Sequence, residues 1–434
     1  MKVLLLMLAV LSLSAGEAPD IQVWHWSGPR TLAPAEEAAL SSLPVATILE
    51  WSGRVSVQHR KPVFTNHGGQ VTGLVTVKRW AVVRIDADCT PLMRDQPDAL
   101  VVLVAKHLRP GVVGLQIDCD VPTKRLVDYA DFLIALRQAL PPGTGLACTG
   151  LLSWLDDSAL AKVVAAVDWW VPQAYSTGLP SQPTQARSLV GGGDLTAVTK
   201  ACEALGRPYR LGLPTFEQIS WWRPDDKLGS AAVRAELEDL FAAGITGEPL
   251  AGDNERIWRF RLTRPARLPV INLPPDALVV VGQPTVAGLH QRIATIRAAA
   301  GPWFRGISLF RLAAPDDLAA LSCAQLVAAV RGEAATPAVT SRWRGTPGSW
   351  TGEIRNAGTD DLIQATFSIG AVADLPPVPF AGGISLVPAA HGQPVALPHA
   401  DSMLLRIPFL RAGRAVVLPA LPGAKPPTIS QVVP

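Results

Sequence analysis

Between Ile21 and Gly332 the sequence alternates eight short apolar runs with longer amphipathic stretches. Short apolar runs are typical of strands buried on both faces, and helical spacing between them indicates crossover helices. The strand candidates are IQVWHW, VATILEW, AVVRIDA, VVGLQID, GLACTGL, DWWVPQAY, YRLGLPTF and GISLFRL. Eight strand and helix units over about 310 residues match a TIM-like (β/α)8 barrel. The pattern therefore predicts an α/β barrel, with insertions near RPDDKLGS and AGDNERIWRF.

The clearest helix is predicted between the fourth and fifth strands. There, in PTKRLVDYADFLIALRQALPPG, apolar residues recur at helical spacing, and a Pro pair ends the segment. A doubly wound open sheet is the alternative architecture. It usually carries a G-x-G-x-x-G phosphate loop after the first strand, and WHWSGPRTLAP has none.

The composition changes after the barrel region. From Glu333 onward, Pro, Gly, Ala and Thr accompany strand-like pieces such as SWTGEIRNAGTDDLIQATFSIG, in which Asn356 begins a turn signal. We expect a barrel over residues 19–332 and a small β-rich, sandwich-like module over residues 333–434. Packing against the barrel and ligand binding are both open as roles for this module.

The N-terminus has the pattern of a cleaved export signal. Lys2 precedes an apolar run of about a dozen residues, followed by small residues at Ser14 and Gly16. The alternative, a membrane anchor, needs about 20 apolar residues, and this run stops at Ala15. The prediction is a signal peptide over residues 1–18, export to the periplasm or the extracellular space, and no membrane span after cleavage.

Charge and cysteine patterns exclude several classes of partner. The net charge is +3, charged residues make up 17%, and no Lys/Arg block is present, so we do not expect nucleic acid as a partner. The five cysteines form no C-x-x-C pair, and the seven histidines form no H-x-H or H-E-x-x-H motif. We therefore expect no disulfide framework, metal site or cofactor. Nothing in the sequence identifies a protein partner.

The stretch VVGLQIDCDVP ends an apolar strand in two carboxylates. Alternation places Leu115, Ile117 and Cys119 on one face, and on the other, inward face Gly114, Gln116, Asp118 and Asp120. The active sites of such barrels collect at the C-terminal ends of the strands. We therefore expect both aspartates at that end of the barrel, about 6 to 7 Å apart along the strand.

Two close carboxylates suit acid catalysis. Mutual repulsion in a partly dry site raises one pKa, which leaves one group able to donate a proton and one that stays ionised. Cleavage of a glycosidic bond requires such an acid. The alternative is that Asp120, which precedes Val121 and Pro122, only caps the next helix or binds loop amides.

The run VGLQIDCD resembles the fourth-strand signature of chitinase-type, family-eighteen glycoside hydrolases, where acids alternate along the strand and the last is the proton donor. The resemblance implies Asp120 as the donor and Asp118 as the supporting acid, with Gln116 in place of the first acid. Asp120 is one methylene shorter than the family's Glu, and Gln116 does not ionise.

Two further runs resemble the same family. VDWWVPQAY is similar to its sixth strand, which implies that Gln173 and Tyr175 face the sugar. GISLFRL is similar to its last strand, which implies that Phe310 floors a subsite. Taken as a whole, the chain is most similar to exported bacterial proteins classed only as a domain of unknown function.

Other polar residues are expected at the same barrel end. In VVRIDADC, Arg84, Asp86 and Asp88 share one face, and Glu50 ends the second strand. Glu217 follows the seventh strand, so Asp120 and Glu217 are an alternative acid and nucleophile pair. Carboxyls about 5 to 5.5 Å apart would indicate retention and about 6.5 to 9.5 Å inversion.

The thirteen tryptophans bear on the ligand. Flat rings stack on sugars, and Trp26 lies just after a predicted strand, although packing in the core is the alternative for each ring. The leading hypothesis is an exported glycoside-hydrolase-like barrel acting on a polysaccharide or oligosaccharide. A non-catalytic carbohydrate-binding or envelope assembly protein is the alternative, and a purely structural envelope protein is a third.

Overall fold

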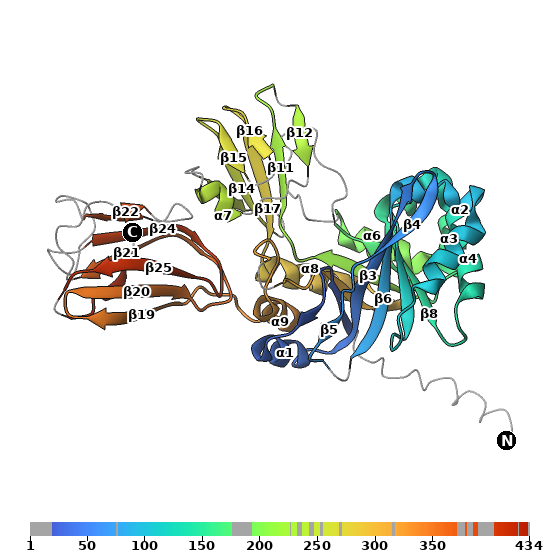
Figure 1. Ribbon diagram of the computed structural model, residues 1–434, viewed down its shortest axis with the longest axis horizontal. Coiled ribbons are helices and arrows are strands. Elements are labelled where there is room, and N and C mark those ends of the chain that lie inside the picture. Colours follow the sequence, from blue (N-terminus) through green and yellow to red (C-terminus); the bar gives the residue numbers. More distant parts are fainter. Residues whose placement is uncertain are drawn as a thin grey trace, which may run out of the picture. The chain divides into compact units, whose positions relative to one another are not determined.

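Eight parallel strands form a closed barrel in the computed structural model (Figure 1). The first strand, β1, pairs in parallel with both β3 and β18, which closes the sheet and confirms the predicted barrel. The eight strands, in chain order, are β1 (Asp20–His25), β3 (Val45–Gln58), β6 (Lys78–Ile85), β7 (Gly114–Asp118), β8 (Gly145–Leu151), β9 (Trp169–Gln173), β10 (Tyr209–Pro214) and β18 (Phe304–Phe310).

The structure describes residues 20–432 with internal gaps, so the predicted signal peptide lies outside the described residues. The gaps are 75–76, 176–192, 226, 232–236, 243–246, 252–254, 269–270, 315–316, 371–377, 380–384, 389–402 and 424. Two compact units are present. The first holds the barrel, and the second holds residues 216–291 and the C-terminal part of the chain.

Helices follow most of the barrel strands, at the predicted amphipathic segments. The helix predicted between the fourth and fifth strands is α4, whose apolar positions Tyr129, Leu133 and Leu136 are fully buried. The helices are α1 (Pro34–Ser41), α2 (Leu92–Asp95), α3 (Pro97–Lys106), α4 (Leu126–Ala139), α5 (Leu160–Ala165), α6 (Leu195–Ala204), α8 (Val286–Ala299) and α9 (Cys323–Arg331). Short 3-10 turns are η1 (Ala87–Cys89), η2 (Thr123–Arg125) and η3 (Leu152–Trp154).

The second barrel strand is longer than predicted. β3 continues to Gln58 and forms an antiparallel hairpin with β4 (Lys61–Asn66). The expected strand stopped at Trp51, although the alternation of Val55 and Val57 with polar residues beyond it is itself a strand pattern. Two short strands, β2 (Arg30–Thr31) and β5 (Val71–Thr72), pair with each other in parallel.

Trp80 fills the barrel interior near the N-terminal ends of β7 and β8, and two glycines make room for it. It packs with Trp24, Leu49 and Val82 in the inner core. A Cβ at Gly114 would lie 2.6 Å from the Trp80 ring, and one at Gly145 would lie 2.5 Å from it. Because both distances are far below a normal contact, only glycine fits at these two positions while Trp80 keeps its place.

An antiparallel sheet is inserted between β10 and β18. Its strand order is β12-β11-β17-β14-β13, and it contains both places where insertions were expected, RPDDKLGS and AGDNERIWRF. Its core contains Trp258, Phe260 and Val281 together with Phe241 of α7 (Leu237–Ala242). The strands are β11 (Gln218–Trp222), β12 (Leu228–Ala231), β13 (Glu248–Ala251), β14 (Glu255–Arg261) and β17 (Leu278–Pro284), with the hairpin β15 (Ala266–Leu268) and β16 (Ile271–Leu273) beside them in sequence.

The C-terminal residues form two sheets around one core, as the predicted β-rich, sandwich-like module. One sheet has the order β19-β20-β25 and the other β22-β23-β24-β21-β26. Ile354 and Leu418 of the first sheet share a core with Phe367 and Leu405 of the second. The strands are β19 (Val339–Thr346), β20 (Ser349–Asn356), β21 (Leu362–Gly370), β22 (Val378–Pro379), β23 (Ser385–Pro388), β24 (Met403–Leu410), β25 (Ala415–Leu421) and β26 (Thr428–Val432).

Two further expectations can be compared with the described residues. All five cysteines are buried and unbridged. Within the described ranges, none of the helices has the length and apolar character needed to cross a membrane.

The barrel interior leads to a stability prediction. Gly114→Ala should lower the free energy of unfolding by about 1–3 kcal/mol, because the new methyl group overlaps the Trp80 ring. Urea denaturation measures this difference. Gly28→Ala is the control, since a Cβ at Gly28 meets no atom within 4 Å. Equal stability of the two variants would contradict the proposed fit between Trp80 and the glycines.

Candidate functional site

The two aspartates of the fourth barrel strand lie where the strand ends. Asp118 is the last residue of β7, and Asp120 follows in the loop. The Asp118 side chain is 9% exposed and that of Asp120 is 36% exposed. A molecule at the C-terminal end of the barrel, hereafter the barrel mouth, would therefore reach Asp120 more easily than Asp118.

Arg84 bridges the two carboxylates. It lies on β6, directly opposite Asp118 in the register of β6 and β7. Its Nη1 donates to Oδ2 of Asp118 at 2.7 Å, and its Nη2 donates to Oδ2 of Asp120 at 2.6 Å. The expected pair of repelling charges is thus a triad with one cation in the middle.

Asp118 is held from three sides. Besides Arg84, Thr149 Oγ1 donates to its Oδ1 at 2.8 Å, and Gln173 Nε2 lies 3.4 Å from the same oxygen. Burial raises the pKa of Asp118, Arg84 opposes the rise, and the charge of Asp120 adds to it. The pKa of Asp118 is thus shifted upward, the direction expected for one of the two acids. The main cause is burial, and repulsion by Asp120 contributes less.

Gln116 lies deeper in the barrel than the two acids. Its Oε1 accepts a 2.6 Å hydrogen bond from Nε1 of Trp24, and the side chain is fully buried. Gln116 therefore faces inward, as the alternation predicted, and it links β7 to β1 inside the barrel.

Aromatic rings gather at the ends of β1 and β18 and in the middle of β3. Trp26 stacks on Trp51 with 5.0 Å between ring centroids, and it meets Phe310 edge-on at 5.5 Å. Tyr175, two residues after β9, stacks on Phe310 at 5.7 Å. All four rings are partly exposed, so together with Arg84, Asp118, Asp120, Thr149 and Gln173 they form the candidate site. Burial raises the pKa of the Tyr175 phenol well above its usual value.

Three of the expected carboxylates are placed differently. Asp86 follows β6 and pairs with Arg54 at 2.7 Å, while Asp88 is exposed on η1. Glu50 points to the outside of the barrel wall, because its neighbour Leu49 faces the interior. There Glu50 binds Arg79 at 2.5 Å and Arg109 at 2.7 Å, so it does not join Asp118 and Asp120.

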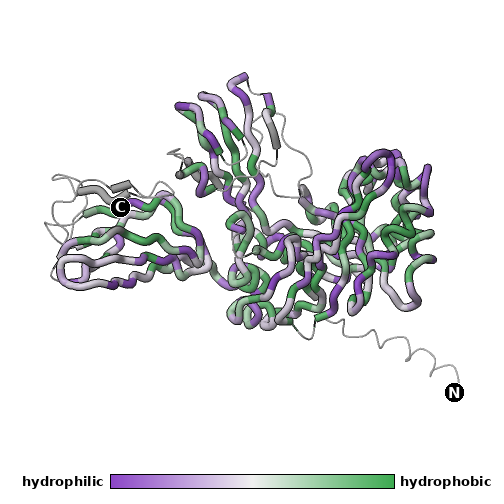
Figure 2. The backbone as a smooth tube through the Cα atoms, viewed as in Figure 1, coloured by the Kyte–Doolittle hydropathy of each residue, from purple (hydrophilic) through white to green (hydrophobic). Residues whose placement is uncertain are grey.

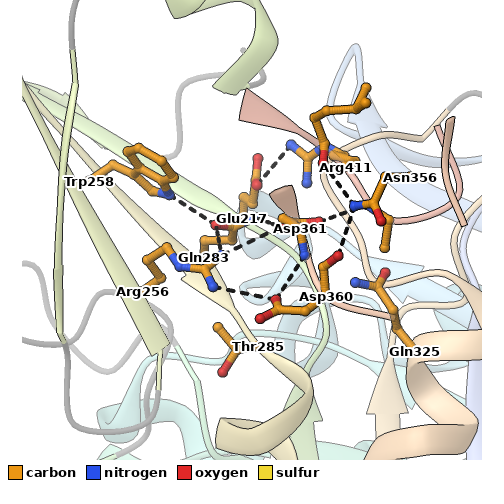
Figure 3. A network of polar contacts seen from close by, with 12 residues as sticks. Glu217, Arg256, Trp258, Gln283, Thr285, Gln325, Asn356, Asp360, Asp361 and Arg411 are labelled. Atoms are coloured by element: carbon orange, nitrogen blue, oxygen red, sulfur yellow. Dashed lines mark hydrogen bonds and ion pairs between the residues drawn. The ribbon is translucent and has the colours of Figure 1, made fainter. Parts of the chain in front are cut away.

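Glu217 belongs to a buried polar cluster in the second unit (Figure 3). Its carboxylate lies 2.8 Å from Nη2 of Arg411, and the same guanidinium binds Glu238 at 2.8 Å. Burial raises the pKa of Glu217 to about 8, although Arg411 opposes the rise, and the charge of Glu238 adds to it. Its carboxylate is thus engaged by Arg411, which gives no support to a role as nucleophile.

The same cluster joins the inserted sheet to the C-terminal module within the second unit. Asp361 accepts a 2.6 Å hydrogen bond from Gln283 of β17 and a 2.9 Å bond from the backbone N of Ala412. Gln283 in turn accepts from Nε1 of Trp258 at 2.9 Å. Figure 3 shows these side chains converging around Asp361 and Arg411. Their contacts are internal to the fold, so the cluster is structural.

A metal site is not found among the residues that the structure describes, since no three His, Cys, Asp or Glu side chains there could hold an ion together.

Residues 77–263 match the model of a family described as "Domain of unknown function (DUF3142)". The expected similarity to a family of unknown function is confirmed over this part of the chain. No curated protein matches the sequence.

Solved structures that resemble the chain include glycoside hydrolases. A chitinase from Chromobacterium violaceum is 13% identical, with a TM-score of 0.48 over 71% of this chain and 98% of its own. Chitinase ChiA74 from Bacillus thuringiensis is 8% identical, with a TM-score of 0.46 over 95% and 100%. The Bacillus cereus spore cortex-lytic enzyme SleL is 12% identical, with a TM-score of 0.46 over 71% and 73%. At these sequence identities the similarity between this chain and the solved structures is one of fold alone.

Sequence reasoning missed the partners of the acids. Arg84 was placed on the correct face, but its position opposite Asp118 depends on the register between β6 and β7. Thr149 comes from β8, and Trp51 stacks with both Trp26 and His67 of the β3–β4 hairpin region. The inward alternation of each strand was the available signal, and only pairing between strands shows which side chains meet.

The cluster around Glu217 leads to a prediction of pH dependence. The folded chain keeps the Glu217 proton up to about pH 8, whereas a free carboxyl loses it near 4.5. Stability from this group is therefore fully present below pH 4.5 and declines as the pH rises toward 8. Urea midpoints between pH 5 and 9 should fall less steeply for Glu217→Gln than for the wild type.

The control for this measurement is Asp131→Asn, which removes an exposed carboxylate from α4. This variant should retain the slope of the wild type. A Glu217→Gln protein with the wild-type slope would show that the group is ionised throughout this range in the folded chain.

Proposed function

We propose that the barrel mouth binds a carbohydrate chain and cleaves a glycosidic bond by acid catalysis. The observation that supports this most directly is the placement of a half-exposed carboxylate, Asp120, in one mouth with the partly exposed rings of Trp26, Tyr175 and Phe310. Aromatic rings offer faces and edges to the apolar sides of sugars, and a carboxyl group protonates the leaving oxygen.

In this proposal the two aspartates have different roles. Asp120 is the general acid, because it is the one that a substrate can reach. Asp118 is the supporting acid, since burial favours its protonated form and three donors keep it in place. Transfer of a proton requires the carboxyl form of Asp120, so Asp120 has to separate from Arg84 in the reactive complex.

The remaining residues of the site would orient the sugar. Gln173 and Tyr175 project from the end of β9 and offer an amide and a phenol as hydrogen-bonding groups. Trp26 and Phe310 would supply apolar contacts. The export signal proposed at residues 1–18 would bring the protein to the periplasm or the extracellular space, where polysaccharides are available as ligands.

Binding without cleavage is the second candidate function, and Arg84 favours it. The ion pair at 2.6 Å engages Asp120 in its charged form, in which a carboxylate only accepts hydrogen bonds. A barrel with this triad could hold a glycan, as a binding or envelope assembly protein would, without donating a proton.

Catalysis can be tested with the mature protein and a set of bacterial and plant polysaccharides, by measuring new reducing ends. Asp120→Asn should lower kcat by about 10²- to 10⁴-fold on any substrate that is cleaved, because the amide cannot act as the acid. Asp120→Glu should retain more activity than Asp120→Asn, since it keeps the carboxyl. The control is Asp131→Asn, on the exposed side of α4.

Calorimetric titration of the same polysaccharides distinguishes the two candidates. Cleavage that is unchanged in Asp120→Asn would exclude Asp120 as the acid. Binding by the wild type and by Asp120→Asn, with no new reducing ends from either, would establish the non-catalytic function.

A further inference from the structure

The outer face of the β19-β20-β25 sheet is exposed and largely polar, with Val417 of β25 as an exposed apolar side chain. Alternation along β19 turns Val339 and Trp343 toward the core of the C-terminal module and leaves Thr340, Arg342 and Arg344 in solvent. Figure 2 shows the contrast between this hydrophilic hairpin and the apolar strands β21 and β24 of the same module. The sheet thus has one face for packing and one that is free for contacts.

Positive charge predominates on this face. Arg355 of β20 lies opposite Thr340, and Glu353 lies opposite Arg342. Glu353 is the acid of the β19–β20 hairpin, and its carboxylate pairs with Arg355 at 3.3 Å. Arg342 and Arg344 make no ion pair with any residue in the described part of the chain, so two guanidinium groups face solvent, with Glu353 as the acidic neighbour of Arg342 across the strands.

We propose that this face binds an acidic polysaccharide, with Arg342 and Arg344 contacting its carboxylates. Residues two apart on a strand are separated by about 6.6 Å, so the two guanidinium groups form a short row along β19. Each guanidinium binds a carboxylate with two parallel hydrogen bonds. Hydroxyl groups of Thr340, Thr346 and Thr351 flank the row on the same face and suit the hydroxyls of a sugar chain.

The chemistry of the face favours this ligand over a nucleic acid or a neutral glycan. Both tryptophans of the hairpin are engaged elsewhere, Trp343 in the core and Trp350 in a 3.0 Å hydrogen bond to the carbonyl of Gly423. Among the described residues of these three strands, no ring is therefore available on this face for stacking bases or neutral sugars. After residue 332 the chain has seven Lys and Arg against six Asp and Glu, too balanced for the broad positive field of a nucleic-acid-binding domain.

This site would give the C-terminal module a role of its own. It involves none of the residues of the barrel mouth, so it stands whether the barrel cleaves glycans, binds them or does neither. An acidic polymer held on the module would keep the protein at a surface that carries such a polymer.

The test is titration of the full chain with polygalacturonate, measured by calorimetry at low salt. Arg342→Gln/Arg344→Gln should weaken binding at least about tenfold, because each charged contact accounts for a large share of such an affinity. Raising the salt concentration should weaken the wild type more than this variant. Dextran, as a neutral polysaccharide, should not compete.

The control is Arg261→Gln/Arg267→Gln, which removes the same charge from exposed positions on β14 of the inserted sheet and on β15 of the neighbouring hairpin. It should bind polygalacturonate within about twofold of the wild type, since neither arginine belongs to the β19-β20-β25 sheet. Equal losses in both double variants, no loss in either, or no binding by the wild type would each overturn the proposal. Tighter binding to duplex DNA than to polygalacturonate would replace it with a nucleic-acid site.

Discussion

Closure of the sheet is the constraint on which the rest of the first unit depends. β1 pairs with both β3 and β18, so every barrel strand has two neighbours, and alternate residues of each strand must fill one shared interior. Trp80 occupies much of that interior because Gly114 and Gly145 leave space for its ring. Beyond this packed layer, the ends of β6 and β7 carry the charged side chains Arg84 and Asp118.

The same constraint explains the composition of the candidate site. Arg84, Asp118 and Thr149 come from three consecutive barrel strands, whose parallel pairing within the closed sheet brings their inward positions next to one another. Two carboxylates at a barrel end would repel each other in a partly dry site, and the guanidinium of Arg84 between them removes most of that repulsion. The strength of the ion pair between Arg84 and Asp120 decides whether Asp120 is available as a proton donor or stays a charged binding group.

Buried charge is handled differently in the second unit. Arg411 is enclosed by Glu217 and Glu238, and Asp361 accepts hydrogen bonds from the inserted sheet and from the chain next to Arg411. Burying such a cluster costs free energy, because each charged group loses its hydration. Removing one partner would then leave another charge buried and unpaired. Its location makes Glu217 part of the attachment between inserted sheet and C-terminal module, although its position after a barrel strand resembles that of a catalytic residue.

The sequence by itself determined the eight strands, most of the helices and the inward face of β7, because these follow from apolar periodicity over a few residues. It also located Asp118, Asp120, Gln173, Tyr175 and Phe310 at strand ends. Only the tertiary structure decided which of these side chains have partners. The pairing of Arg84 with both aspartates, the outward direction of Glu50 and the capture of Glu217 by Arg411 depend on register and on contacts between distant segments. Local patterns carry no information on such contacts, since a shift of one residue in register would exchange the two faces of a strand.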